Sequence, residues 1–168
     1  MNMITKQTFI KSVLREVDII KHLAEKITPE VLVYKPTESQ RTTLELLGYL
    51  AVGPGIALQV AKAGDQSLFA VSGEKQKEVT LENFREIIDK EAAEIKSTME
   101  AMTDEELNEE IDLWGSGMKE PRSQHILTLV LLSFVAYKMQ LFLYLKSSGL
   151  VHLNTQNVWQ GRDPEPKN

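Results

Sequence analysis

Two polar residues one helical turn apart interrupt the most apolar stretch of the chain, "LLSFVAYKMQLFLYLKSSG" at residues 131–149. Ser133 and Tyr137 have the i, i+4 spacing that places two side chains on one face of a helix. A helix offers two ligands to a metal ion most simply at this spacing. A serine or tyrosine hydroxyl, however, binds a divalent ion poorly unless it loses its proton. Ser133 and Tyr137 are therefore either ordinary residues of a buried helix or what is left of a chemical site.

Apolar residues recur at helical spacing in four segments, which must position these side chains. Thr42 and Glu45 fit a capping box at the start of the second segment, and Gly53-Pro54-Gly55 predicts a kink or break near residue 53. Gly149 suits the left-handed position that ends the fourth. The sequence thus predicts helices at about residues 6–27, 43–63, 81–102 and 123–147.

The segments between these helices lack a sustained period. Residues 28–42 are expected to be irregular, and residues 64–79 are long enough to be a crossover connection. Gly115 and Gly117 permit a tight turn between two short extended pieces. The tail is expected to be irregular from about residue 150. Four long helices without a convincing strand system predict an all-α fold, an antiparallel four-helix bundle, in a single domain over residues 1–168.

Composition excludes several function classes. Lys and Arg total 19 against 24 Asp and Glu, for a net charge of −5, so no nucleic-acid partner is expected. The chain has no cysteine and no export signal at its start, which predicts a cytoplasmic protein without disulfides or thiolate metal sites. Lys138 and Gln140 lie well inside residues 126–145, so this segment is not expected to span a membrane.

The fourth helix is apolar on nearly every side, more than the core of one bundle can use. We therefore expect its surplus face to meet a second copy of the chain in a homodimer.

Three motifs, in order along the chain, resemble those of the DinB-like (YfiT-like) proteins. The run "AYKMQLFLYLKSSG" is similar to their last helix, which typically reads His-Arg-x-Gln-Leu, then Tyr-Leu-Arg and a closing Gly. "RTTLELLGYL" resembles their second helix, and "LNTQNVWQGRDPEP" resembles the tail of some members. The resemblance implies an up-down-down-up four-helix bundle, frequently a homodimer, and often a divalent metal held by three histidines. Some relatives transfer low-molecular-weight thiols or isomerise substrates with a thiol cofactor.

Carried over from these motifs, the three metal-binding histidines of the family fall on Tyr49, Ser133 and Tyr137. This chain departs from the pattern at all three positions, so we expect a degenerate metal site with no metal, no cofactor and no inherited catalytic residue. The histidines that are present are at positions 22, 125 and 152, and no two of them have ligand spacing.

Several residues have two readings. Tyr49, Ser133 and Tyr137 either pack in the core with their hydroxyls bonded, or form the polar floor of a small-molecule pocket to which Glu45 adds an acid. Asn157 and Trp159 either anchor the tail, which we favour through burial of the Trp, or cover a pocket. The acidic residues 104–112 are expected to be a solvated surface.

Two function classes follow. We expect a metal-free small-molecule-binding or scaffolding homodimer, because losing three ligands removes the Lewis acid that would activate a thiol or water. The alternative is a thiol-dependent transferase or isomerase with a rearranged site, either with or without a metal. Whether the chain is an enzyme stays open at this stage.

Overall fold

Four long helices lie close to where the apolar periodicity predicts them, in a computed structural model that describes residues 5–165. They are α1 (Lys6–Ala24), α3 (Thr43–Ala63), α5 (Phe84–Ala101), and a continuous helical segment made of α7 (Arg122–Ile126), the π-helical turn η2 (Leu127–Leu132) and α8 (Ser133–Ser147). Their apolar faces meet in one hydrophobic core. The predicted all-α bundle is therefore confirmed.

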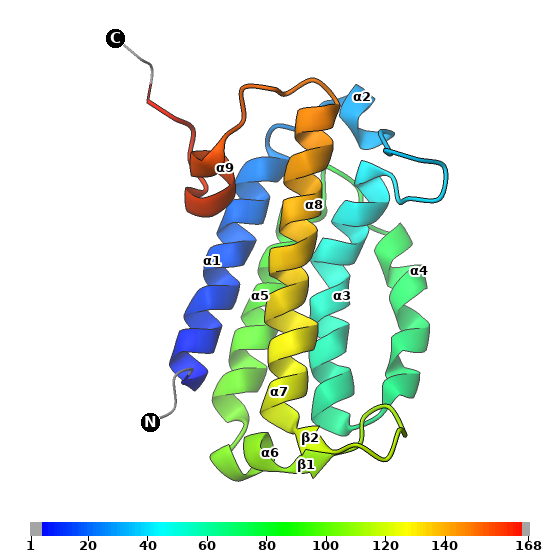
Figure 1. The fold of residues 1–168 in the computed structure, drawn as a ribbon, viewed down its shortest axis with the longest axis vertical. Helices are drawn as coiled ribbons and strands as arrows, with labels where there is room; N and C mark the ends of the chain where they lie inside the picture. The colour runs from blue at the N-terminus through cyan, green and yellow to red at the C-terminus, as the bar shows by residue number, and fades with distance from the viewer. Residues whose placement is uncertain (1–4, 166–168) are drawn as a thin grey trace.

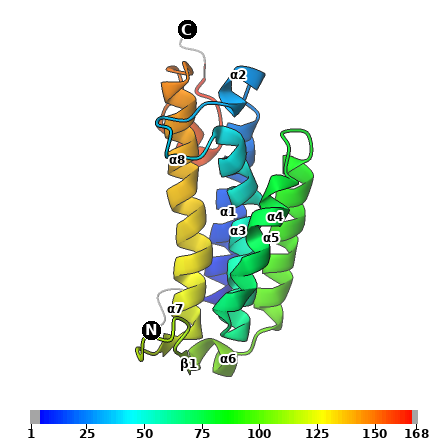
Figure 2. The ribbon, with the colours of Figure 1, turned by 90° about the vertical axis from the view of Figure 1, so that its right-hand side faces the viewer.

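The helices pack as a square in which α1 and α3 lie on one diagonal, since each of them contacts both α5 and α8. Along the chain α1 rises, α3 and α5 descend, and α7 with α8 rises, which is the predicted up-down-down-up topology (Figure 1). Figure 2 shows α8 and α5 on opposite sides of the molecule with α1 and α3 between them. Consequently the side chains of α3 and α8 can meet directly.

A crossover joins the two descending helices, as predicted, but it is helical rather than irregular. It comprises η1 (Gln66–Val71) and α4 (Ser72–Lys77), which pack against α3. Neither has a buried residue, which explains why the sequence shows no apolar period there. Gly48 of α3 allows the close approach, since a Cβ at that position would lie 2.6 Å from the carbonyl oxygen of Gln76.

Short elements close the two ends of the bundle. α2 (Pro29–Leu32) lies in the segment expected to be irregular, and α6 (Asp104–Asn108) follows α5. The two predicted extended pieces are present as β1 (Glu110–Ile111) and β2 (Glu120–Pro121), paired antiparallel with Ile111 opposite Glu120. The predicted capping box between Thr42 and Glu45 is also present at the start of α3.

Two expectations about the helices need correction. A kink or break was predicted near residue 53, and the break is absent because α3 continues through Pro54. Burial of Pro54 and of both flanking glycines offsets the hydrogen bond that proline removes. The tail is not irregular throughout, because Asn154 and Asn157 form a capping box that starts α9 (Thr155–Gln160). α9 packs on α1.

Two helical segments have the length and apolar composition that a membrane span needs. They are Thr43–Ala63, which is 78% buried in the bundle over its most apolar window, and Arg122–Ser147, which is only 33% buried. The first is explained by its central place in the core. The second carries apolar side chains on an outward surface.

Candidate functional site

The three positions carried over from the DinB-like motifs converge between α3 and α8. The ring centroids of Tyr49 and Tyr137 are 4.3 Å apart, with the ring planes tilted by 47°. The Ser133 and Tyr137 side chains lie close enough to the Tyr49 hydroxyl to influence its acidity. All three residues are partly buried rather than sealed in the core. We refer to these three residues as the hydroxyl cluster.

Local sequence explains how α3 holds Tyr49 in place. A Cβ on Gly53, one turn further along the helix, would lie 3.2 Å from the Tyr49 ring, so the glycine leaves space for the ring. On α8, Ser133 and Tyr137 are one turn apart and reach the same side of the helix.

A cation that the sequence analysis did not single out lies over the cluster. The guanidinium carbon of Arg41 is 5.0 Å from the centroid of the Tyr49 ring and 5.8 Å from that of Tyr137. Both distances are in the range of cation–π attraction. Residues 41, 45 and 49 follow one another at intervals of four, but Arg41 precedes the N-cap Thr42 and lies outside α3, so helical spacing does not predict its position.

Burial is the main influence on the acidity of Tyr49. It raises the pKa of the phenol above its ordinary value, and the neighbouring Tyr137 raises that pKa further. The Ser133 side chain and the charge of Arg41 act in the opposite direction. Tyr49 therefore keeps its proton at neutral pH, and its hydroxyl is a neutral donor and acceptor.

A cavity of about 250 Å³ lies between the start of α3 and α4; Arg41 lines it, whereas the three residues of the hydroxyl cluster do not. Arg41, just before α3, and Glu45 of α3 line it on one side, and Gly73, Gln76 and Lys77 of α4 line it on the other. Glu45 is held by the capping box, in which its carboxylate accepts from the Thr42 backbone N–H at 2.7 Å, and this bond lowers its pKa. Glu45 therefore faces the cavity as a carboxylate, and its role as a helix cap comes first.

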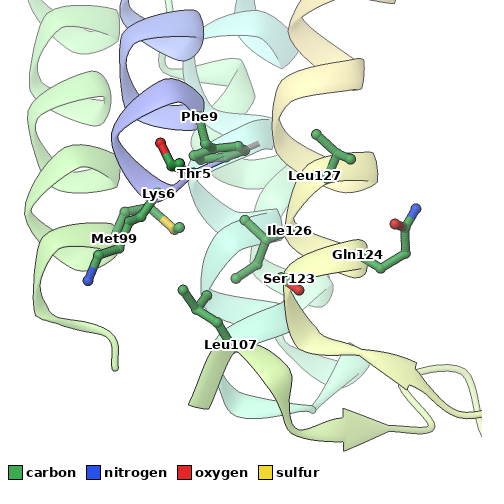
Figure 3. A pocket seen from close by; sticks show the side chains of 9 residues that line it. All are labelled: Thr5, Lys6, Phe9, Met99, Leu107, Ser123, Gln124, Ile126 and Leu127. Carbon is green, nitrogen blue, oxygen red and sulfur yellow. The ribbon is translucent and has the colours of Figure 1, made fainter. Parts of the chain in front are cut away.

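A second cavity lies at the opposite end of the bundle (Figure 3), with a volume of about 170 Å³. Phe9, Met99 and Leu107 contribute apolar walls, while Thr5 and Ser123 contribute hydroxyls. The Lys6 ammonium at this cavity donates to the carbonyl of Met102 at 2.8 Å. The cavity is apart from the hydroxyl cluster, and its cation is already bonded to backbone.

A buried ion pair connects α8 to α1 next to the cluster. The Lys138 side chain is 2% exposed, and its Nζ lies 2.5 Å from Oε2 of Glu16. That oxygen has no hydrogen-bond partner within residues 5–165, so the contact holds by charge. The Trp159 ring of α9 lies 5.3 Å from the same ammonium. This pair fixes α8, α1 and the tail together.

The tail is anchored by Asn157 rather than by Trp159. Asn157 is 1% exposed and donates to Asp163 at 2.9 Å and to the His22 ring at 3.2 Å, whereas Trp159 is 55% exposed. The expectation that Trp159 secures the tail by burial was therefore wrong. An amide can satisfy several partners in a buried position, whereas the indole here lies over Lys138 with one face open to solvent.

The histidines lie at separate places in the fold. His125 is buried, with Nε2 3.4 Å from the carbonyl oxygen of Ile111, while His152 is exposed. His22 contacts the tail as described above. Within residues 5–165, no group of three His, Asp or Glu side chains has the arrangement of a metal site.

The acidic segment includes one charge with a specific partner. Glu109 is 59% exposed, as expected for a solvated surface, and it forms a 2.6 Å ion pair with Arg122, which is buried and also donates to the carbonyl oxygens of Ala61 and Lys62 at the end of α3. The sequence did not predict this pair because Arg122 lies 13 residues away on the other side of the β1–β2 turn.

Comparisons by sequence and by structure both found the same protein. No family model matches the chain. The "Uncharacterized protein YjoA" of Bacillus subtilis (strain 168) is 25% identical over 136 residues, which cover 81% of this chain and 86% of that protein. The crystal structure of YjoA, described as a DinB-like protein, superposes with a TM-score of 0.65, covering 83% of this chain and 90% of that chain.

Proposed function

Because this chain is a DinB-like protein, we propose that it is a metal-free homodimer that binds a small molecule at the hydroxyl cluster of Tyr49, Ser133 and Tyr137. The observation that carries the proposal is that three polar side chains from α3 and α8 meet in a partly buried position beneath Arg41, which also lines a cavity of about 250 Å³. Small-molecule sites combine a concave surface with a few convergent polar groups in this way.

The charge at the cluster supports the metal-free part of the proposal. The three hydroxyls are neutral at pH 7, since phenols have a reference pKa of about 10, and neutral hydroxyls compete poorly with imidazole for zinc or nickel. The guanidinium of Arg41, 5.0 Å from the Tyr49 ring, would also repel a divalent cation.

Elemental analysis after extensive dialysis tests this directly, and far less than one transition metal per chain is expected. The variant Tyr49→His/Ser133→His/Tyr137→His should acquire measurable affinity for zinc or nickel, because three imidazoles would then converge. One tightly held ion per wild-type chain would contradict the metal-free assignment.

An unbiased metabolite-binding screen tests the binding function itself. Ligands should bind the wild-type chain and lose affinity in the variant Tyr49→Phe/Ser133→Ala/Tyr137→Phe, which removes the three hydroxyls and keeps the rings. Tyr34→Phe is the matched control, since the Tyr34 ring packs on Tyr144 with centroids 5.7 Å apart. Metal-dependent thiol transfer by the wild-type chain would instead support the alternative reading of the sequence as a thiol-dependent enzyme.

The homodimer part of the proposal, including a scaffolding role, is supported by the outward surface of the Arg122–Ser147 segment. Leu132 is 48% exposed and Leu143 is 52% exposed, and both lie on a strongly apolar segment. Burying these side chains against a second copy would remove apolar area from water. A cytoplasmic location, which suits a chain without cysteine, is part of the same proposal.

A further inference from the structure

We propose that the ligand of this site is a small carboxylate anion, recognised by the guanidinium of Arg41 above the rings of Tyr49 and Tyr137. The inference rests on the proposed binding function and adds the chemical class of the ligand. It depends on which hydrogen-bond donors at the site are already used and which are free.

Arg41 is held in position without using its donors. The two tyrosine rings lie 5.0 and 5.8 Å from its guanidinium carbon, and attraction to their faces orients the planar group. Within residues 5–165, its side chain makes no hydrogen bond and no ion pair. The N–H groups in the guanidinium plane are therefore available, and their fork matches a carboxylate in a bidentate arrangement.

The other charged groups around the cavity are already engaged. Lys77 pairs with Glu74 at 2.7 Å, and Lys35 pairs with Glu38 at 2.6 Å. Glu45 accepts from both the backbone N–H and the hydroxyl of Thr42. Arg41, which is exposed, is thus the cation at this cavity whose guanidinium is open to a ligand.

The hydroxyl cluster supplies a further donor. Each of the three hydroxyls carries one proton and can donate it to a ligand. Burial raises the pKa of Tyr49, so the phenol does not become an anion that would compete with one. A guanidinium beside a neutral donor is suited to a carboxylate and unsuited to a cation.

The space beside Arg41 limits the size of the ligand. The cavity of about 250 Å³ is below the range of about 300–1,000 Å³ that is typical for drug-sized ligands. Its far wall is Gly73 and Gln76 of α4, which contribute little bulk. A carboxylate with a single ring or a short chain therefore fits.

The test uses the full-length protein and two probes of equal shape, benzoate and the uncharged benzamide, in calorimetric or NMR titrations. Benzoate should bind more tightly than benzamide by about 10-fold or more, as expected for a bidentate charged pair. Arg41→Gln should remove that preference. Arg85→Gln is the control, since it lowers the net charge equally at an exposed ion pair with Glu25 and should leave benzoate binding unchanged.

A second variant should strengthen benzoate binding rather than weaken it. Glu45→Gln removes a carboxylate that faces the cavity, while glutamine still completes the capping box with Thr42. Benzoate affinity should rise by about 2- to 5-fold, since a nearby negative charge is lost.

The outcomes separate this inference from the proposed function. If benzamide binds as well as benzoate, or if Arg41→Gln binds benzoate as the wild type does, the carboxylate assignment is wrong. The same holds if acetate, benzoate and phenylacetate all fail to bind. The binding function survives any of these results when an uncharged ligand from the screen still depends on the hydroxyl cluster, and it fails when no ligand depends on that cluster.

Discussion

Glu91 is a partly buried carboxyl group on α5 that packs against a glycine of α3. A Cβ on Gly55 would lie 1.9 Å from Oε2 of Glu91, so the carboxyl of α5 occupies the space that a side chain on α3 would fill. Burial raises the pKa of Glu91 above its model-compound value of 4.5, and the charge of Glu94 raises it further. Lys75 and Lys90 act weakly in the opposite direction.

Glu91 should therefore make the folded protein less stable as the pH rises. Its folded-state pKa is above its unfolded value, so the folded chain binds more protons between the two values, and the free energy of unfolding falls across that window. Groups with lowered pKa, such as Asp163, have the opposite slope. We expect the stability advantage of Glu91→Gln over the wild type to grow from about pH 4 to about pH 7 in urea titrations.

Glu94→Gln provides the control for this prediction. It removes a negative neighbour that raises the pKa of Glu91, so it should reduce the pH dependence without abolishing it. A difference between Glu91→Gln and the wild type that stays constant across the pH range would contradict the assignment.

At the residue scale, the sequence predicted the hydroxyl cluster but not its surroundings. Ser133 and Tyr137 could be placed together because helical spacing is local, and Tyr49 followed from the alignment of a motif. Arg41 could not be placed over the rings, since it precedes α3 and its side chain reaches Tyr137 of α8, which lies more than 90 positions away. The pairing of Lys138 with Glu16 could not be predicted for the same reason, because the two residues lie on different helices and far apart in the sequence.

At the element scale, two glycines of α3 leave space for different kinds of neighbour, which are backbone atoms at Gly48 and a flexible side chain at Gly55. A Cβ on Gly48 would lie 2.6 Å from a backbone oxygen of Gln76, whereas a Cβ on Gly55 would meet only the end of a flexible glutamate. Gly48→Ala would force α4 away from α3. Gly55→Ala would push the carboxylate of Glu91 towards solvent.

The two alanine variants should therefore differ in stability. Gly48→Ala is expected to lose about 1–3 kcal/mol in urea denaturation, the usual cost of overpacking against a fixed neighbour. Gly55→Ala should be close to neutral, since the helix propensity gain of up to about 1 kcal/mol offsets the displacement of Glu91. Equal losses in the two variants would show that α4 yields as easily as a side chain.

Arg122 hydrogen-bonds the end of α3 to α6 and to Glu109, which follows α6. It is 7% exposed, and it donates to the carbonyl oxygens of Ala61, Lys62 and Glu106 as well as to the Glu109 carboxylate. The last carbonyls of a helix have no partner within the helix, so Arg122 satisfies groups that would otherwise be buried unpaired.

Replacing Arg122 should be costly. Arg122→Met keeps much of the apolar stem and leaves these carbonyls unpaired, which predicts a loss of about 3 kcal/mol in the free energy of unfolding. Arg85→Met is the matched control, because the side chains of Arg85 and Glu25 are 64% and 54% exposed, and exposed pairs contribute at most about 1 kcal/mol. Similar losses for both arginines in urea titrations would contradict this role.

The long helices were predictable because each buries one apolar stripe, while the short ones were not. α4 has no buried residue and therefore no period, and α9 is six residues long and depends on a cap between Asn154 and Asn157. The unbroken course of α3 through Pro54 depends on burial by neighbouring helices, which outweighs a strong local signal. These features follow from tertiary contacts rather than from local pattern.

At the scale of the whole molecule, the two most apolar helical segments differ in how much of each is buried. Thr43–Ala63 is 78% buried at the centre of the fold, while Arg122–Ser147 is 33% buried. Its exposed positions form a stripe at helical spacing, which includes Leu132, Ala136 and Leu143. α8 lies at one side of the bundle in Figure 2, so this stripe is accessible along its length.

We expect this stripe to be the interface of a homodimer, and charge placed on it should dissociate the dimer. The interface should bury about 1,000 Å² or more, the size that stable protein interfaces need. Leu132→Glu/Leu143→Glu puts two carboxylates into that surface at exposed positions, where the bundle itself tolerates them. Sedimentation velocity at micromolar concentration should then give a dimer for the wild type and a monomer for the variant. Val33→Glu, at a position 72% exposed near α2, is the control and should remain dimeric. A wild-type chain that sediments only as a monomer would leave the stripe without the partner we assign to it.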